Sequence, residues 1–299
     1  MRVAKVEKDM KILVTGSHGM LGSAFVEILK KRRIPYVPYD RAHPEAIDSD
    51  ITAVVHFAGI TPYSFVKGKA PSATAYRAAN VAGTATLLDA LSRAKKLTRF
   101  INIGSAAELG FSPRPFLEDS PCHPDNPYGE SKLAQSALVK AFARTRSVKT
   151  FNLRVFNITG FTDHRSTGRP ASGRPHLFTA LANQFGGEPP RVIEVNSAKD
   201  VRDFVVPEDV LEAIFVALIA EAGGTYEVIN ICSGRGTTIS DVVELFGKVL
   251  HSPYTLKSLS RTQRASVGVA KKAERLLGWR PKISLERAIK NYVGGAASS

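Results

Sequence analysis

The sequence predicts an α/β fold in which a doubly wound parallel sheet carries a smaller C-terminal substrate-binding domain. An apolar run at 12–15 leads directly into glycines at 16, 19 and 22. Further apolar runs of strand length follow at 34–39, 52–58, 99–103 and 226–231. Helical segments at 20–31, 75–95 and 128–144 alternate with these runs, which is typical of a parallel sheet with helices on both faces.

The glycine-rich turn favours a phosphate-binding site. Gly16 makes the tight turn, Gly19 lets the backbone approach a pyrophosphate, and Gly22 lets the following helix pack on the strand. The N-terminus of helix 20–31 then faces an anion. His18 lies inside the turn and is either a phosphate contact or a variable turn residue. Ordinary turn chemistry is the alternative for the spacing as a whole.

Asp40 follows the second predicted strand, about twenty residues past the glycines, where an acid can hold an adenosine ribose. Residues 41–51 are too few for a full helix and strand before the next apolar run, so we expect one strand of the sheet to be absent. Asp48 and Asp50 are either adenine contacts or polar loop residues.

Composition indicates a globular protein. With 299 residues, 43% of them apolar, the chain can bury one large core or two smaller ones. No apolar run approaches the roughly 18 residues that span a bilayer, and residues 1–10 lack the apolar core of a signal peptide. Cys122 and Cys232 lie far apart without metal-ligand spacing, so we interpret them as reduced thiols. We therefore expect a cytoplasmic protein with no membrane partner and no bound metal.

The formal net charge of +14 raises the question of a nucleic-acid partner. Basic residues cluster between Lys140 and Arg174, where Asp163 is the only acid. No aromatic-interleaved basic motif of a nucleic-acid module accompanies them, and a pocket for a sugar nucleotide diphosphate also needs positive charge. We therefore predict no nucleic-acid binding.

Candidate catalytic residues lie at a strand end and a helix start. Ser105 follows the run 99–103, at the edge where open parallel sheets bind ligands. Tyr128 and Lys132 are four residues apart in helix 128–144 and therefore share one face. An ammonium group there can lower the pKa of a phenol while it holds a ribose. The alternative is an exposed aliphatic stem over an aromatic ring.

Several motifs follow one another in order along nearly the whole chain. The first half carries Thr15-Gly-x-x-Gly-x-x-Gly22, Asp40, His56-Phe-Ala-Gly59, Asn80-Val-Ala-Gly-Thr84, Ser105 and Tyr128-x-x-x-Lys132. The second half carries Leu153-Arg-Val-Phe-Asn157, Val201-Arg-Asp-Phe-Val205, Asn230-Ile-Cys-Ser-Gly234 and Leu277-Gly-Trp-Arg-Pro281. In this ordered set the chain resembles an extended short-chain dehydrogenase/reductase of the NAD-dependent nucleotide-sugar epimerase/dehydratase family, which has a Rossmann fold.

The resemblance implies a role for each matching residue. Tyr128 is the base for a sugar hydroxyl, Ser105 hydrogen bonds the reacting oxygen, and Lys132 and the nicotinamide lower the pKa of the phenol. Asn80 has a structural part in the site. The implied cofactor-binding residues are Gly16, His18, Gly19, Met20, Leu21, Asp40, Arg41, Phe57, Ala58, Gly59, Asn80, Tyr128 and Lys132.

The implied substrate-binding residues are Ala107, Asn157, His176 and Arg202, and the implied substrate is a nucleotide-diphosphate sugar. Arg202 suits the diphosphate because guanidinium pairs with phosphate through two hydrogen bonds. Its alternative is a salt bridge to Asp203 or Asp209. His176 and the nearby Arg165, Arg169 and Arg174 either line the sugar pocket or form a solvated basic loop.

The residues after Ser105 decide between reactions. Dehydratases of the family place an Asp-Glu pair directly after the hydroxyl residue, and decarboxylases place a Glu two positions after it. This chain has Ala106 and Ala107, which cannot move a proton, so epimerisation or carbonyl reduction is favoured. Glu108 departs from the family's Val-Tyr-Gly and is interpreted as a rim residue, with a bulge that brings it into the site as the alternative.

The function predicted is that of an NAD-dependent epimerase acting through a transient keto sugar. Asp40 favours NAD because its carboxylate would repel the extra phosphate of NADP. Arg41 is the complication, since it either pairs with that phosphate or stacks on adenine. An NADP-dependent 4-keto sugar-nucleotide reductase and a non-catalytic NAD-binding regulator are the alternatives.

The predicted domains interleave along the chain. Residues 1–157 and 203–231 form the NAD-binding Rossmann domain, and 158–202 and 232–299 form the substrate-binding domain. By resemblance, helices 75–95 and 128–144 form a four-helix interface in a homodimer. A C-terminal helix is predicted over 270–292, and Trp279, the only tryptophan, is interpreted as a packing residue.

Overall fold

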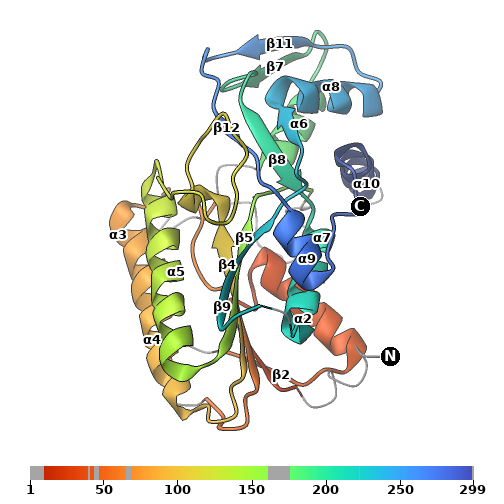
Figure 1. Cartoon of the computed structure of the whole chain (residues 1–299). Coiled ribbons are helices and arrows are strands. Elements are labelled where there is room, and N and C mark those ends of the chain that lie inside the picture. Colours follow the sequence, from red (N-terminus) through yellow and green to blue (C-terminus); the bar gives the residue numbers. More distant parts are fainter. Residues whose placement is uncertain are drawn as a thin grey trace.

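The computed structural model describes residues 10–39, 41–43, 47–64, 69–160, 176–221 and 223–297. Its main sheet has six parallel strands in the order β2-β1-β3-β4-β5-β9 (Figure 1). They are β1 (Ile12–Thr15), β2 (Tyr36–Pro38), β3 (Ala53–His56), β4 (Arg99–Ser105), β5 (Lys149–Val155) and β9 (Tyr226–Ile231). The predicted doubly wound parallel sheet is confirmed.

The strand order reverses beside β1. The chain passes from β1 through α2 (Met20–Arg32) to β2 on one side and then to β3 on the other side. Between β2 and β3, the described residues 41–43 and 47–52 contain no strand, as the short connection predicts. The carboxyl ends of β1 and β3 therefore flank a topological switch point, where such sheets bind ligands.

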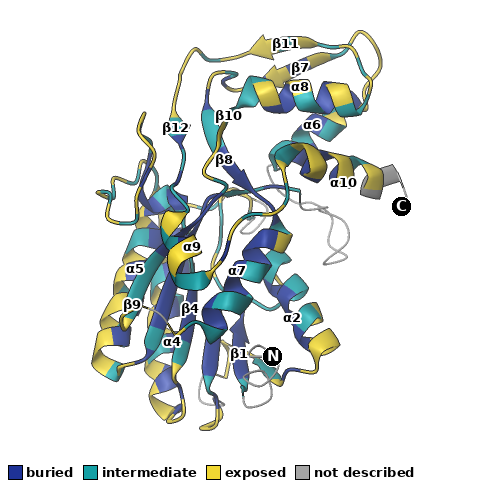
Figure 2. Ribbon diagram, turned by 45° about the vertical axis from the view of Figure 1, so that its right-hand side comes forward, coloured by how far each residue is buried: buried dark blue, intermediate teal, exposed yellow. Residues whose placement is uncertain are grey.

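Helices cover both faces of the main sheet, which is why its strands are almost continuously apolar. Alternate residues of β1 point to opposite faces: Ile12 and Val14 enter the core beneath α2 and α7 (Pro207–Ile219), and Leu13 enters the core beneath α4 (Gly83–Ala90) and α5 (Pro127–Arg146). Burial follows this arrangement, with buried strands between helices whose outer faces are exposed (Figure 2).

The helix predicted over 75–95 is instead a series of short segments. These are α3 (Ala73–Tyr76), a π-helical stretch η3 (Arg77–Ala82), α4 and a 3-10 turn η4 (Leu91–Arg93). The π-helical stretch contains Asn80, whose side chain bonds outside the helix to Ile60 and Ser131. Such insertions concentrate at functional sites, and apolar periodicity does not reveal them.

A smaller region lies beyond the carboxyl ends of the main strands (Figure 1). One of its sheets contains β6 (Asn157–Ile158), β8 (Val201–Val205), β10 (Gly236–Thr238) and β12 (Ala265–Ser266), and the other pairs β7 (Val192–Val195) with β11 (Thr255–Ser258). Its helices α6 (Leu177–Phe185), α8 (Ile239–Val249) and α10 (Leu285–Ala297) share a core around Phe178, Phe246 and Ile289. The predicted boundary at 203 falls inside β8, so we propose that the domains divide after β8.

The C-terminal helix predicted over 270–292 is two helices, α9 (Lys271–Leu277) and α10. Gly278 ends α9 with a φ of 65°, a left-handed conformation that favours glycine. Trp279 follows it, 2% exposed, and its indole nitrogen donates to the Asp209 carbonyl at 2.9 Å, so its packing role is confirmed.

Two negative findings concern the described residues alone. None of the helices there combines the length and apolar character needed to cross a bilayer. Cys122 and Cys232 form no disulfide with each other in this part of the chain.

Candidate active site

The glycine-rich turn joins β1 to α2 at the switch point. Gly16 has a φ of +65°, and a Cβ there would lie 2.8 Å from the Ala58 nitrogen. A Cβ on Gly22 would lie 2.1 Å from the Gly16 carbonyl oxygen, so α2 approaches the turn only because residue 22 is glycine. Gly19 donates to that carbonyl at 2.9 Å. The turn therefore has the close packing that the sequence predicts.

The start of α2 fits a dinucleotide pyrophosphate. Gly19 caps the helix without a side chain, and the first turn contains no acid, so the N-terminal N–H groups and the helix dipole favour an anion. Met20 and Leu21 are half-buried at this start. His18 is exposed, with its Nδ1 3.3 Å from the Ser17 hydroxyl.

The adenosine end of the site is described in part. Asp40 lies outside the described residues, so its role remains a prediction. Arg41 is exposed, and its guanidinium lies near the start of α4. The adenine contact weighed for Asp48 and Asp50 is wrong, because both pair with Lys11 Nζ, at 2.7 and 3.0 Å, at the opposite end of β1 from the turn.

Ser105 and Tyr128 come together from β4 and α5. Ser105 ends β4 and caps the short helix η5 (Ala106–Glu108). Its hydroxyl accepts from the Ala107 N–H at 3.2 Å and lies close enough to the Tyr128 phenol to lower the pKa of that group. Gly129 permits this approach, because a Cβ there would lie 2.3 Å from the Ala107 carbonyl oxygen.

Burial raises the pKa of Tyr128 to about 12, and the nearby Ser105 side chain lowers it by less. The expectation that Lys132 and the nicotinamide together lower this pKa stays a prediction. The Lys132 ammonium is directed elsewhere, donating to the Ile103 carbonyl at 2.7 Å and to Gln135 Oε1. Desolvation of the phenolate therefore dominates.

Lys132 is itself buried, at 7% exposure. Burial lowers the pKa of Lys132 to about 8, and the charge of Glu108 opposes that shift. Its acceptor Gln135 also donates to Thr84 Oγ1 at 2.9 Å. The lysine is thus held by β4, α5 and, through Gln135, α4.

His56 extends this polar network to the glycine turn. Thr84 donates to the Asn80 carbonyl at 2.7 Å. His56 Nε2 lies 2.9 Å from Thr84 Oγ1 and 3.0 Å from Gln135 Nε2, and His56 Nδ1 lies 2.7 Å from the Thr15 hydroxyl, so both ring nitrogens are in hydrogen-bonding contact. Burial lowers the pKa of His56 to about 3, so the ring is neutral. The sequence motifs predict no role for His56 or Gln135. The one feature that could have indicated a site residue is the position of His56 at the end of an apolar strand.

Asn80 fixes the loop that follows β3. It is fully buried, accepts from the Ile60 N–H at 2.7 Å, and donates to Ser131 Oγ at 2.9 Å. A Cβ on Gly59 would lie 2.9 Å from its Oδ1. Phe57, at the start of the loop, packs on Phe25 with ring centroids 5.4 Å apart. Asn80 thus holds this loop against α5, and its part in an active site stays a prediction.

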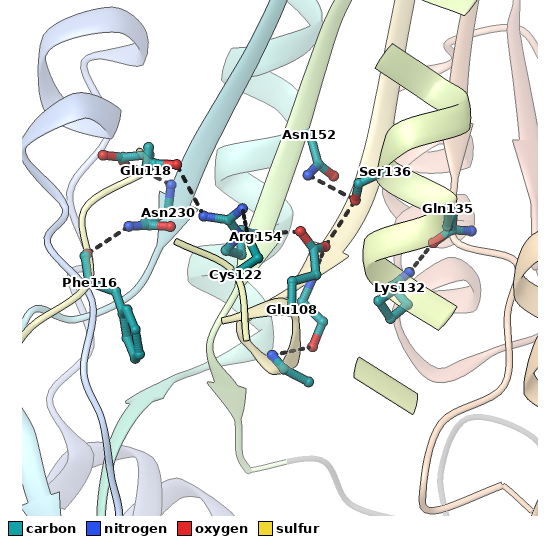
Figure 3. A network of polar contacts seen from close by, with 12 residues as sticks. Glu108, Phe116, Glu118, Cys122, Lys132, Gln135, Ser136, Asn152, Arg154 and Asn230 are labelled. Carbon is teal, nitrogen blue, oxygen red and sulfur yellow. Dashed lines mark hydrogen bonds and ion pairs between the residues drawn. The ribbon is translucent and has the colours of Figure 1, made fainter. Parts of the chain in front are cut away.

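Glu108 is not a rim residue. Its side chain is fully buried at the end of η5, where Oε2 pairs with Arg154 Nε at 3.3 Å (Figure 3). The rim interpretation is therefore wrong, and the bulge weighed as the alternative is not found, because Glu108 lies in the short helix η5. The partner is 46 positions away in the chain, and nothing local to Glu108 indicates it.

Arg202 and Asn157 lie on the paired strands β8 and β6. Asn157 Nδ2 donates to the Asp203 carbonyl at 3.0 Å. Arg202 pairs with Asp200 at 2.8 Å, not with the Asp203 or Asp209 weighed from the sequence. Its guanidinium carbon lies 4.8 Å from the centre of the Phe111 ring.

His176 lies at the start of α6 and stacks on Tyr63 from the loop after β3, with ring centroids 3.8 Å apart. This contact joins the smaller region to the cofactor side of the main sheet. Arg165, Arg169 and Arg174 lie outside the described residues.

These features define a dinucleotide-dependent oxidoreductase site, with a glycine turn beside a Ser-Tyr-Lys set at a topological switch point. The model of the NAD dependent epimerase/dehydratase family matches residues 12–232, and the chain belongs to this family of enzymes.

Named relatives of the chain include both epimerases and reductases. It is 28% identical to a UDP-glucose 4-epimerase of Lactobacillus helveticus, over 91% of this chain and 92% of the relative. It is 27% identical to a GDP-6-deoxy-D-mannose reductase of Pseudomonas aeruginosa, over 94% and 95%. The structure of a Thermotoga maritima UDP-glucose 4-epimerase with UDP-glucose matches with a TM-score of 0.80 and 25% identity, over 97% and 99%.

Proposed function

We propose that this chain is an NAD-dependent epimerase that acts on a nucleotide-diphosphate sugar through a transient keto sugar. The observation that carries the proposal is that Ser105 and Tyr128 lie close together, with Lys132 one helical turn further along, at the carboxyl edge of the sheet and next to the glycine turn. The family and the similarity to a UDP-glucose 4-epimerase support it.

In this reaction Tyr128 removes the proton from a sugar hydroxyl and Ser105 holds the same oxygen. A bound dinucleotide supplies the hydride acceptor and returns the hydride. Lys132 has three N–H donors, two of which go to Ile103 and Gln135, and we assign the third to a ribose hydroxyl. Because the pKa of Tyr128 is about 12 in the chain alone, cofactor and substrate must lower it for the base to form near neutral pH.

The substrate proposed is a UDP-hexose. Arg202 supplies a cation for the diphosphate, and Asn157, Ala107 and His176 are assigned to the same pocket. Ala106 and Ala107 cannot supply the extra acid or base of a dehydratase. The relatives named for UDP-glucose epimerisation support the uridine nucleotide.

The cofactor proposed is NAD, with the Asp40 carboxylate on the ribose. The test is a competition titration of NAD and NADP on the apo-protein. Tighter binding of NAD, weakened in Asp40→Ala, supports the proposal. Tighter binding of NADP, unaffected by Asp40→Ala, overturns it and favours the 4-keto sugar-nucleotide reductase that the Pseudomonas relative represents.

We also propose a homodimer formed through α4 and α5. The outer surface of α4, α5 and the adjoining η3 exposes small residues that allow close helix packing, namely Ala78, Ala82, Ala85, Ala134, Ala137 and Ala141. Sedimentation at micromolar concentration is expected to give a dimer, and a monomer would contradict the proposal.

Mass spectrometry of ligand released from purified protein tests the function as a whole. We expect NAD, with or without a UDP-hexose. NAD bound without any catalytic turnover of nucleotide sugars would favour the regulator instead.

A further inference from the structure

A buried carboxylate, that of Glu108, contacts the backbone of Ser105 next to the proposed base Tyr128. Glu108 Oε1 accepts from the Ser105 N–H at 3.0 Å and from the Ser136 hydroxyl at 3.0 Å. Its Oε2 pairs with Arg154 Nε at 3.3 Å. Glu108 thus ties Ser105 to α5 and β5 at the same time, and Figure 3 shows its contacts with Ser136 and Arg154.

The carboxylate belongs to a connected set of buried polar groups. Asn152 Nδ2 donates to Ser136 Oγ at 3.1 Å, and its Oδ1 accepts from Asn102 at 2.7 Å. Arg154 reaches the Glu118 carbonyl at 3.4 Å. A buried ion pair contributes little net stability compared with apolar packing, so this set needs a reason beyond holding the fold together.

Gly104 indicates that β4 is adapted to this carboxylate. A Cβ at that position would lie 2.9 Å from Glu108 Oε1 and 2.6 Å from Asn152 Oδ1. Glycine inside a strand is unfavourable by itself, so its presence is explained by the side chains that fill the space. The side chains of Glu108 and Asn152 therefore pack against Gly104, the residue that precedes Ser105 in β4.

We propose that Glu108 is a positioning residue for the active site: by accepting from the Ser105 N–H and from Ser136 on α5, it holds Ser105 in place beside Tyr128. The inference deepens the proposed function and rests on it for its kinetic test. Arg154 pairs with the carboxylate so that it can remain buried.

Two double variants separate this role from simple packing. Glu108→Met with Arg154→Met removes both charges and the acceptor at similar side-chain volume. Glu108→Gln with Arg154→Met also removes both charges, but keeps an oxygen that can accept from Ser105 and Ser136. The two proteins differ only at position 108, where one has an amide with an acceptor oxygen and the other a thioether, and neither leaves an unpaired buried charge.

With UDP-glucose as substrate, we expect the Met/Met variant to lose about tenfold or more in kcat, with KM and the Kd for NAD unchanged within about twofold. The Gln/Met variant should retain most of the kcat. Equal kcat values in the two variants would overturn the proposal.

Crystal structures of the two variants decide the question independently of turnover. The Ser105 hydroxyl should move away from Tyr128 Oη in the Met/Met variant and keep its wild-type position in the Gln/Met variant. An unchanged position of Ser105 in both would overturn the positioning role. If the wild type turns over no nucleotide sugar, the proposed function fails and this structural comparison still decides the inference.

Should the Met/Met variant not fold, Ser136→Ala provides the kinetic test, because it removes one bond to the carboxylate and keeps the ion pair. A several-fold loss of kcat at unchanged KM is expected, and an unchanged kcat would count against the proposal.

Discussion

At the scale of single residues, burial decides which groups of the site carry charge. It raises the pKa of Tyr128 to about 12 and lowers those of Lys132 and His56 to about 8 and about 3. The base is therefore neutral in the chain alone, and the histidine is a permanent hydrogen-bonding group. The sequence places Tyr128 and Lys132 one helical turn apart, but their effect on each other depends on where the ammonium points.

Tyr128→Phe tests the base. The substitution keeps the ring and removes the proton-transfer group, so turnover should fall roughly a hundred- to ten-thousand-fold. The Kd for NAD, measured by calorimetry, should change little. Unchanged turnover would exclude Tyr128 as the base.

His56 predicts a pH dependence of stability. Its folded pKa of about 3 lies below the ordinary 6.5, so the stability it contributes is complete above pH 6.5 and is lost as the pH falls toward 3. Between pH 7 and pH 5 the free energy of unfolding should fall by about 2 kcal/mol more in the wild type than in His56→Gln. Urea denaturation at both pH values measures this, and parallel losses would show that His56 does not titrate on unfolding.

Arg202→Ala distinguishes a substrate contact from a structural ion pair. Loss of a bidentate phosphate contact should weaken UDP-sugar binding by about 1.5–3 kcal/mol, as measured by calorimetry. Asp200 then loses its partner at 2.8 Å but keeps Arg264 at 3.6 Å, so the fold should survive. Equal affinity in a folded variant would make Arg202 structural.

At the scale of elements, the site depends on close approaches that only glycine permits. The helix η5 touches α5 at Gly129, and α2 touches its own turn at Gly22. The sequence predicts β9 with its exact bounds, because its apolar pattern is regular. The sequence does not predict η3. The side chain of Asn80 bonds there to a loop 20 positions away, and the apolar pattern around it is that of an ordinary helix.

Gly129→Ala is expected to reduce both stability and turnover. Its Cβ would meet backbone at 2.3 Å, so α5 and η5 must separate, at a cost of about 1–3 kcal/mol. Gly83→Ala in α4 is the matched control, because its Cβ would have 3.7 Å to the nearest atom. That control should be neutral or up to about 1 kcal/mol more stable in thermal denaturation. Similar losses in both variants would refute the packing argument.

At the scale of the whole molecule, the ordered motifs predict both sheet topology and the missing strand. The glycine turn, Ser105 and Tyr128 come from separate segments, yet the parallel sheet brings them to one edge because all its strands end there. The buried Glu108–Arg154 ion pair could not be predicted from the sequence. Arg154 lies on β5, and no local sequence pattern links that position to η5. Substrate assignment likewise depends on pocket shape rather than on any motif.

The central claim is that hydride leaves and returns to the same sugar, and isotope retention tests it most directly. Purified protein with catalytic NAD is incubated with UDP-glucose deuterated at the carbon that is oxidised, C4, and the products are analysed by NMR and mass spectrometry. We expect the C4 epimer with the deuterium retained and no net formation of NADH. Absence of the epimer, or product formation only with stoichiometric NADPH from a 4-keto sugar nucleotide, would contradict the account.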